Sequence, residues 1–301
     1  MAISFGVHTG QQDLAMDDLR RTWREIDAAG MDWISVWDHF YEAPPRDGSG
    51  ACFEAVSVMA ALAAETQNVR VGCLVFCMGY RNPGVLAKAA VTIDHVSNGR
   101  LELGLGAGWH VAEHQAFGIP FPSVKTRLDK LEESVQIIRS LFTEERTTFI
   151  GDHFQVEDAY CNPKPIQEQP RIWIGGGGEK RTLRIVAKYA DGWNSAYISA
   201  EGYRHKCQVL DQWCEWEGRD PENIARNVNV HFQMGADEAA ARRKREAFKG
   251  QGALLGTPQE VIERIGDYAK AGAQGLNIAL RAPFDWEALQ AFMEEVAPAF
   301  K

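Results

Sequence analysis

The sequence predicts an α/β fold, a closed (β/α)8 TIM barrel, on three observations. Short apolar runs typical of strands alternate with amphipathic helical segments of about 10 to 15 residues, which indicates a parallel sheet. This rhythm repeats about eight times, the number that closes such a barrel. A chain of 301 residues also has the length of one barrel. We therefore expect a single domain over residues 1–301.

Each strand-like run is followed by a helical one as the chain proceeds. The first four pairs are 3–8 with 14–29, 33–37 with 53–64, 69–76 with 85–96, and 101–105 with 125–142. The last four are 172–174 with 183–189, 192–197 with 203–216, 228–234 with a helix from Pro258, and 276–280 with 286–296. Gly30 is placed to end the first helix. Thr257 and Glu260 form a capping box around Pro258, with Gly272 as the stop.

Two insertions interrupt this rhythm, at residues 143–170 and 235–256. The first is expected to contain a hairpin that turns at Gly151-Asp152 and returns through a proline-rich segment, and the second contains a charged helix. Because barrel active sites lie at the carboxyl ends of strands, segments that leave those ends are candidate lids.

The charge and the cysteines narrow the functional class. A net charge of -9 argues against a nucleic-acid or acidic-membrane partner and suits a protein that handles small molecules. No apolar run reaches the roughly 20 residues of a membrane span, and the N-terminus shows no signal peptide, so we expect a cytoplasmic protein. The six cysteines have no paired C-x-x-C spacing and are expected to be reduced and mostly buried.

The stretch 171–194, RIWIGGGGEKRTLRIVAKYADGWN, predicts a strand, a glycine turn and a helix. Glycine amides and the positive end of a helix dipole favour a phosphate, and Lys180 and Arg181 add positive charge. The alternative is a turn that needs a positive φ, but one glycine normally suffices for that. No Rossmann fingerprint or Walker motif is present, which removes support for NAD and ATP.

Polar residues directly after the strands are the candidate site. They are His8, Asp38 with His39, the segments 72–77, 106–110 and 175–181, Asn194 and His231. Asp38 beside His39 suits proton transfer near neutral pH, whereas His8 and His231 could equally be hydrogen-bonded histidines inside the barrel. His110 to His114 matches the H-x-x-E-H zinc pattern, but it follows a strand within a turn and lacks a third ligand, so we expect no metal.

Four segments in order resemble the bacterial luciferase-like oxidoreductases, in the branch that uses the deazaflavin F420. They are SVWDHF at 35–40, RVGCLVFCMGYRNPGVLAKAAVTIDHVSNGRLELGLGAGWHVAEH at 70–114, IGGGGEKRTLRIVAKYADGWN at 174–194 and LLGTPQEVIERIGDYAKAGAQGL at 254–276. The resemblance covers nearly the whole chain. It implies an F420-dependent enzyme that transfers hydride between the cofactor and a small organic substrate.

The resemblance also implies where the cofactor lies. Its phosphate would bind the backbone of Gly176, Gly177, Gly178 and Glu179, with Arg181 as a further contact. Its ring would lie against a bulge in the third strand that contains a cis peptide between Cys73 and Leu74, next to Asp38, Gly106, Ala107 and Gly108. These positions are expectations from the family pattern.

The remaining implied roles concern the reaction. His39, with Asp38, would donate or accept a proton, and the substrate pocket would include His8, Trp109, Asn194 and His231. Sugar-phosphate dehydrogenases of this branch carry a glutamate where this chain has Trp109, so we expect an apolar, aromatic pocket. Cys52 and His231 approximate positions used by flavin-dependent sulfonate monooxygenases.

Two rival functions stay open. One is a two-component monooxygenase that receives reduced FMN from a partner reductase, and the other is a flavin-binding protein without turnover, which would not need Asp38 and His39. The resemblance further implies a homodimer through the second and third helices, for which the apolar face at 56–64 is suited.

Overall fold

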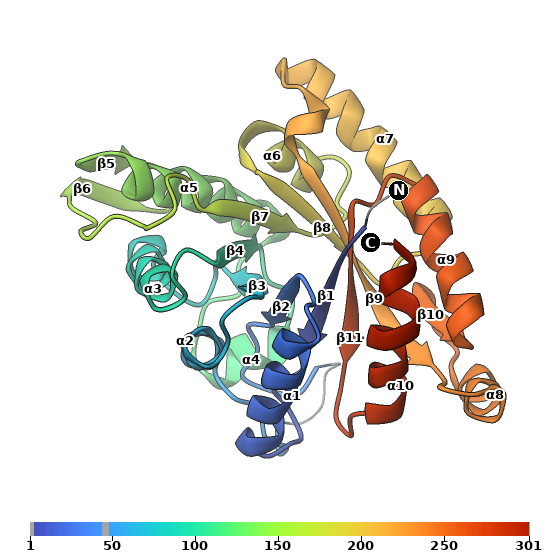
Figure 1. The fold of residues 1–301 in the computed structure, drawn as a ribbon. Helices are drawn as coiled ribbons and strands as arrows, with labels where there is room; N and C mark the ends of the chain where they lie inside the picture. The colour runs from blue at the N-terminus through green and yellow to red at the C-terminus, as the bar shows by residue number, and fades with distance from the viewer. Residues whose placement is uncertain (1–2, 44–47, 301) are drawn as a thin grey trace.

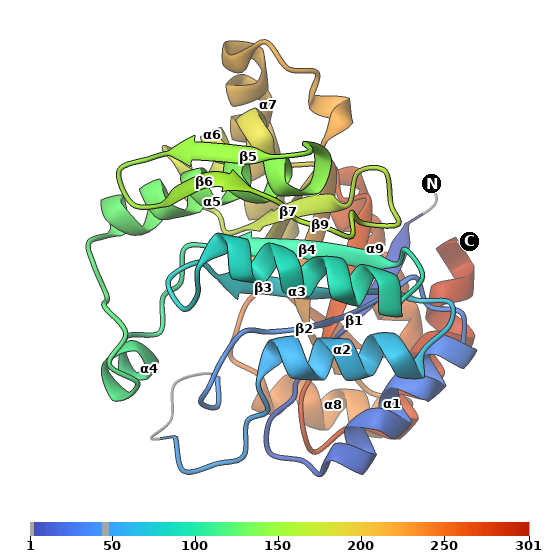
Figure 2. The same ribbon diagram turned by 90° about the vertical axis from the view of Figure 1, so that its left-hand side faces the viewer.

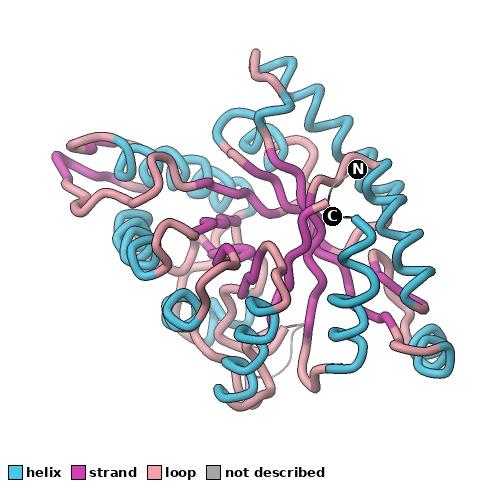
Figure 3. The backbone as a smooth tube through the Cα atoms, in the orientation of Figure 1, coloured by secondary structure: helices cyan, strands magenta, loops and turns pink. Residues whose placement is uncertain are grey.

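The computed structural model describes residues 3–43 and 48–300 and forms a (β/α)8 barrel. In this part of the chain, eight parallel strands close a ring in the order β1-β2-β3-β4-β7-β8-β9-β11, and β11 pairs with β1. Figures 1 and 3 show the strands converging at the centre of the molecule with helices around them. The predicted fold class is confirmed.

The barrel strands match the eight predicted runs. Their bounds are β1 Ser4–Thr9, β2 Trp33–Val36, β3 Arg70–Cys77, β4 Leu101–Gly106, β7 Arg171–Gly175, β8 Gly192–Ala196, β9 Ala225–Met234 and β11 Gly275–Leu280. The helices between them are α1 Met16–Ala28, α2 Ala55–Glu65, α3 Pro83–Val96, α5 Val124–Thr143, α6 Thr182–Tyr189, α7 Ala200–Glu217, α9 Pro258–Lys270 and α10 Trp286–Ala291. Short segments η2 Phe292–Val296 and η3 Ala297–Phe300 continue α10, and η1 Pro221–Asn223 follows α7.

The residues predicted to begin or end helices adopt the conformations and hydrogen bonds expected of them. Gly30 has a φ of 70° after α1, and Gly272 has a φ of 102° after α9, conformations that glycine adopts without a steric penalty. Thr257 and Glu260 form both hydrogen bonds of the capping box, with Pro258 in the first turn. These local signals explain why the helix bounds could be read from the sequence.

The first insertion is the predicted hairpin, with β5 Thr147–Ile150 antiparallel to β6 Gln155–Ala159. Its turn is fixed to α5, because the Glu133 carboxylate accepts from the backbone N–H groups of Asp152, His153 and Phe154 at 2.9 to 3.3 Å. The hairpin therefore lies along α5, as Figure 2 shows, and supplies none of the described pocket residues. It is not a lid in this structure.

The second insertion contains α8 Glu238–Ala247 and a short strand, β10 Ala253–Gly256. β10 is parallel to the carboxyl half of β9, so it extends the wall of the barrel beyond the ring. Phe248, between α8 and β10, lies 5.3 Å from His231 on β9, measured between ring centroids. This insertion thus reaches the same end of the barrel as the candidate site.

The barrel interior is filled in layers from its amino-terminal end. Trp33, Leu74 and Trp173 form a separate apolar cluster, and the indole N–H of Trp173 donates to the buried Glu102 carboxylate at 2.6 Å. Asn194 and Asn277 each donate to the Asn229 side chain at 3.0 Å. The polar asparagine layer lies toward the carboxyl end, where the pocket opens.

The described residues contain no disulfide bond and no helix suited to span a membrane. All six cysteines are free, and five of them are buried, with Cys52 partly exposed. Within residues 3–43 and 48–300, no helix combines the length and apolar character that a membrane span requires.

Candidate functional site

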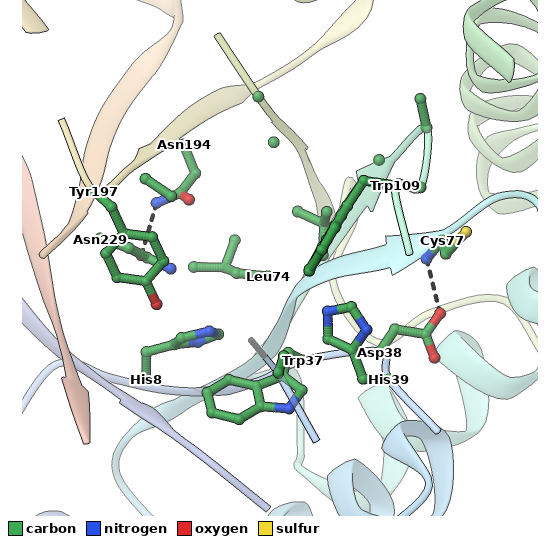
Figure 4. A pocket seen from close by; sticks show the side chains of 18 of the residues that line it. His8, Trp37, Asp38, His39, Leu74, Cys77, Trp109, Asn194, Tyr197 and Asn229 are labelled. Atoms are coloured by element: carbon green, nitrogen blue, oxygen red, sulfur yellow. Dashed lines mark hydrogen bonds between the residues drawn. The ribbon is translucent and has the colours of Figure 1, made fainter. Parts of the chain in front are cut away.

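A pocket of about 350 Å³ opens among the carboxyl ends of the strands. Its size is typical of sites for small molecules and cofactors. The predicted residues that line it are His8, Asp38, His39, Leu74, Gly106, Ala107, Gly108, Trp109, Gly176 and Asn194. Figure 4 shows His39 and Trp109 on one side of Leu74, and His8 and Tyr197 on the other. The structure therefore brings most of the predicted residues into one cavity.

The bulge in β3 lies at the back of this pocket. Cys73 pairs with Leu103 and Phe76 with Leu105, so β3 has one more residue than β4 across this interval. The cis peptide joins Leu74 to Val75, and the prediction of Cys73-Leu74 was wrong by one residue. The reason is the register: Cys73 is still paired and fully buried, and the irregular segment begins after it.

Glycines in the neighbouring strands make room for this bulge. A Cβ at Gly106 in β4 would lie 2.4 Å from Val75 Cγ2, and one at Gly175 in β7 would lie 2.7 Å from Val75 Cγ1. A Cβ at Gly104 would lie 2.1 Å from the Cys73 carbonyl oxygen, in the backbone of the same bulge. Side chains at these positions would push Val75 out of place, so the glycines shape the back wall of the pocket.

His39 is held by a buried carboxylate that the sequence did not reveal. Its Nδ1 lies 3.0 Å from Glu113 Oε2, and the Glu113 side chain is fully buried. An ionised carboxylate can only accept, so Nδ1 carries the hydrogen and donates. In the described part of the chain Nε2 makes no hydrogen bond, and it is the nitrogen available to the pocket.

Glu113 is itself fixed in the ionised state. The backbone N–H groups of Phe40 and Tyr41 each donate to Oε1 at 2.8 Å, and the Tyr80 hydroxyl donates to Oε2. Burial favours the neutral form, yet the hydrogen bonds from His39, Tyr80 and the backbone lower the pKa of Glu113 to about 2. The ionised carboxylate therefore fixes the orientation of the His39 imidazole.

Asp38 lies beside His39 but is tied to a different partner. Its carboxylate accepts from Arg81 Nη1 at 2.6 Å and Nη2 at 2.9 Å, and from the Cys77 backbone N–H at 2.7 Å. Burial raises the pKa of Asp38, and the Arg81 guanidinium and the Cys77 N–H oppose that rise. This bidentate pair fixes the end of β2 against the end of β3.

The H-x-x-E-H segment is a short helix, α4 Val111–Ala116, and not the turn that the sequence suggested. His110 precedes it and packs against His39, at 5.5 Å between ring centroids. His114 Nδ1 instead pairs with the Pro120 carbonyl oxygen at 3.1 Å. Among the described residues, no three His, Cys, Asp or Glu side chains are grouped as metal ligands. Glu113, the acidic residue of this pattern, instead accepts a hydrogen bond from His39.

Among the residues that the structure describes, the histidines of the opposite wall, His8 and His231, have no carboxylate partner. His8 Nδ1 lies 2.8 Å from the Ser35 hydroxyl, and burial, followed by the nearby Arg281, lowers the pKa of His8 to about 3. His231 stacks on Tyr197 at 4.1 Å between ring centroids, behind the pocket surface, and burial lowers its pKa to about 4. Both imidazoles are neutral near pH 7.

Tyr197 takes an uncommon backbone conformation to line this wall. Its φ is 55°, in the left-handed region that bulky residues rarely adopt. Its backbone N–H donates to the Asn229 carbonyl oxygen at 2.8 Å, which holds the turn after β8. The phenol ring is thereby placed between the pocket and His231.

The glycine loop after β7 lies at the far edge of the pocket. Gly176 has a φ of 126° and lines the pocket, whereas Gly177, Gly178, Glu179 and Arg181 lie beyond it. A Cβ at Gly177 would meet only Lys206 Cε at 3.7 Å and Ser195 Oγ at 4.0 Å. The loop backbone is therefore open to a ligand, with Lys206 beside it.

The charged residues of this loop point elsewhere. Arg181 donates to Asp129 at 2.7 Å and to Glu132 at 3.3 Å, both on α5. The Glu179 carboxylate accepts from Lys206 at 2.6 Å and pairs with His205 at 3.0 Å. The positive charge nearest the open glycines thus comes from Lys206 on α7.

Several pocket residues were missed by sequence reasoning. They are Trp37, Ala43, Tyr80, Ala196, Tyr197, Asn229 and Arg281, whereas Val75, Cys77 and Gly175 fall within the predicted segments 72–77 and 175–181. Arg281 had a readable signal, because it directly follows the last strand, where polar residues face a barrel site. Glu113 and Lys206 had none, since each lies on a helix far in sequence from the residue it serves.

Cys52, which the resemblance placed near a reaction centre, is a poor nucleophile here. Its Sγ donates to the His39 carbonyl oxygen at 3.5 Å. Burial, with nearby carboxylates, raises the pKa of Cys52 to about 12, so the thiol is protonated near neutral pH.

Comparison with known proteins defines the class to which this barrel and site belong. The model of the luciferase-like monooxygenase family matches residues 1–253, and the chain belongs to that family. The predicted luciferase-like oxidoreductase class is confirmed.

Individual relatives narrow the resemblance. The chain is 31% identical over 246 residues to the F420-dependent glucose-6-phosphate dehydrogenase of Amycolatopsis mediterranei, covering 79% of this chain and 72% of that protein. An F420-dependent secondary alcohol dehydrogenase in complex with an F420-acetone adduct has a similar fold, with a TM-score of 0.86 and 20% identity over 100% of both chains. The oxygenating constituent of 3,6-diketocamphane monooxygenase from Pseudomonas putida, in complex with FMN, has a TM-score of 0.80 and 17% identity, covering 100% and 99%.

Proposed function

We propose that this protein is an F420-dependent oxidoreductase that transfers hydride between the deazaflavin and a small organic substrate, with His39 assisting proton transfer. The observation that carries the proposal is the His39–Glu113 pair at the mouth of a pocket backed by the β3 bulge. The sequence relative named above is F420-dependent, which supports the choice of cofactor.

The residues present fit such a cofactor. The flat back wall at Leu74 and Val75, cleared by glycines in β4 and β7, suits a planar ring. The open backbone at Gly177, with Lys206 beside it, suits a phosphate at the amino end of α6. The Arg181 guanidinium is directed to two carboxylates on α5, whereas Lys206 pairs with Glu179 of the loop and lies beside Gly177, so we assign the phosphate to the loop backbone and Lys206.

The chemistry divides between the cofactor and the chain. A bound deazaflavin supplies hydride transfer at a carbon centre and reacts little with oxygen. His39 Nε2 takes a proton from a substrate hydroxyl or returns one to a carbonyl oxygen, while Glu113 stabilises the imidazolium. Trp109, 53% exposed and 5.3 Å from His39 between ring centroids, covers the reacting region with an apolar surface.

Binding of F420 and of FMN, each oxidised and reduced, tests the cofactor directly. We expect fluorescence quenching and calorimetry to show tighter binding of F420 than of FMN by the purified protein. Preference for reduced FMN would replace the proposal by the two-component monooxygenase, with a reductase as partner. Binding of F420 without turnover of alcohols, enones or imines would favour a cofactor-binding protein.

A pair of variants tests the phosphate assignment with equal charge changes. Lys206→Met should weaken F420 affinity by about tenfold or more, because a charged hydrogen bond to the phosphate is lost. Arg181→Met should change it much less, since that guanidinium pairs with Asp129 and Glu132. The reverse order of effects would move the phosphate to the α5 side of the loop.

The proposal includes a homodimer formed through α2 and α3, which lie side by side on the outside of the barrel (Figures 1 and 2). Val85 on α3 is 63% exposed, and Val56 and Ala60 on α2 are partly exposed. Val85→Glu should produce monomers in analytical ultracentrifugation. Val124→Glu, at a residue 61% exposed on α5, is the matched control and should leave the dimer intact.

A further inference from the structure

Arg281 is a cation in the pocket that the proposed proton transfer does not use. It directly follows β11 and lines the cavity with His8, Trp37 and Tyr197. Its Nη1 donates to the Ala43 carbonyl oxygen at 2.8 Å, and its guanidinium carbon lies 5.4 Å from the centroid of the Trp37 ring. The guanidinium is therefore held at the pocket wall by neutral groups.

Arg281 and Arg81, the other arginine near the pocket, differ in whether carboxylates surround the guanidinium group. Arg81 is neutralised by Asp38 at 2.6 Å and by Glu54 at 3.4 Å. For Arg281, no carboxylate oxygen of residues 3–43 or 48–300 lies within 4.0 Å, and its buried Nε has no hydrogen-bond partner among these residues. A buried donor on a charged group without a partner is costly, and an acceptor in the pocket would remove that cost.

The neighbouring titratable groups leave the positive charge on Arg281. Burial and then Arg281 itself depress the pKa of both His8 and His231, so these histidines are neutral near pH 7. The Tyr197 hydroxyl, 3.5 Å from Arg281 Nη2, adds a neutral donor and acceptor. This wall therefore presents a positive, hydrogen-bonding corner to a ligand.

We propose that Arg281 binds an oxyanion of the substrate, so that the enzyme acts on a small alcohol or carbonyl compound that carries a carboxylate or phosphate group. This inference rests on the proposed function. A guanidinium is suited to such groups, because its planar N–H donors can contact two oxygens at once. The substrate would then extend from Arg281 across the pocket to His39, with its reacting carbon at the His39 side.

Calorimetry on the full chain tests this inference, with and without saturating F420. The probes are 3-hydroxybutanoate, its neutral methyl ester and inorganic phosphate. We expect the native protein to bind at least one anion about tenfold or more tightly than the ester, the effect of charged hydrogen bonds. Tighter binding of 3-hydroxybutanoate than of phosphate identifies a carboxylate substrate, and the opposite order identifies a phosphate ester.

Three variants locate the effect. Arg281→Met should abolish the preference for the anion over the ester, and Arg281→Lys should retain part of it. Arg242→Met, which removes the same charge from an exposed position on α8, should leave it unchanged. Unaltered F420 affinity and thermal unfolding of Arg281→Lys would show that the fold is preserved.

Two results would overturn the inference, and they differ from failure of the proposed function. Equal binding of 3-hydroxybutanoate, phosphate and the ester by the native protein would remove the anion site, as would an anion preference that survives in Arg281→Met. Absence of F420 binding would instead overturn the cofactor assignment, and with it the role of any anion site as a substrate site.

Discussion

The two walls of the pocket each carry a histidine, and they hold it in opposite ways. On the wall built from β2 and β4, His39 donates through Nδ1 to the ionised Glu113. On the wall built from β1, β9 and β11, His8 Nδ1 lies 2.8 Å from the Ser35 hydroxyl, and the imidazole lies near Arg281. A carboxylate partner stabilises an imidazolium, whereas burial near a cation keeps an imidazole neutral. One wall is therefore suited to proton transfer and the other to binding.

The largest expected effect comes from removing the imidazole of each wall in turn. His39→Ala should lower kcat by about 100-fold to 10,000-fold, the usual contribution of a general acid or base, with much less change in the Kd for F420. His8→Ala, the matched variant on the other wall, should lower kcat by less than about tenfold. Steady-state kinetics and F420 titrations of both variants measure this difference. Equal losses of kcat and F420 affinity in His39→Ala would contradict a proton-transfer role.

The next effect concerns the carboxylate that distinguishes the two walls. The pKa of Glu113 is about 2 in the folded protein, below the ordinary glutamate value of 4.5. Its ionisation thus stabilises the fold fully above pH 4.5, and this contribution is lost as the pH falls toward 2. The loss should amount to roughly 3 kcal/mol.

Glu113→Gln isolates that contribution. The difference in unfolding free energy between the native protein and Glu113→Gln should be greatest near neutral pH and should shrink on acidification. Chemical denaturation at a series of pH values measures it, and kcat should fall because His39 loses its charged partner. A difference that is independent of pH would show that Glu113 is not held ionised.

A smaller effect tests whether the back wall behind His39 is as closely packed as its glycines indicate. Gly106→Ala would place a Cβ 2.4 Å from Val75 Cγ2, which should destabilise the fold by about 1 to 3 kcal/mol and weaken F420 binding. Gly266→Ala in α9 is the matched control, since nothing beyond the adjacent residues and backbone of its own helix lies within 4 Å of its Cβ position. In a helix this change should stabilise by about 0.5 to 1 kcal/mol. Similar stability in both variants would contradict the packing argument.

The smallest effect is the absence of a titration. The pKa of His8 is lowered to about 3 and that of His231 to about 4, so their imidazole resonances should stay constant from about pH 5 to pH 8. Below pH 6.5, His8 is protonated in the unfolded chain but stays neutral in the folded protein. Acidification therefore lowers the free energy of unfolding through this residue. NMR of histidine-labelled protein measures the titration of both imidazoles. A titration of His8 between pH 5 and pH 8 would remove the contrast between the walls.

The sequence predicted the barrel well because its signals are local. Apolar periodicity marks each strand and helix. Gly30, Gly272 and the capping box at Thr257 each mark the end of a helix that begins or ends within a few residues of them. Predicted site residues that closely follow a strand, such as Asp38, His39 and Trp109, line the pocket. The prediction of the cis peptide was wrong by one residue, because its position in the β3 bulge depends on pairing between strands.

What the sequence determined by itself was therefore the order of strands and helices, and the set of polar residues delivered to one end of the barrel. Only the tertiary structure decided the partners of those residues. Glu113 meets His39 across 74 positions of the chain, and Arg281 meets the carbonyl group of Ala43 across 238. Such pairs form only when the ring of strands closes. The charges that distinguish the His39 wall from the Arg281 wall thus depend on barrel closure and strand register, which no local pattern records.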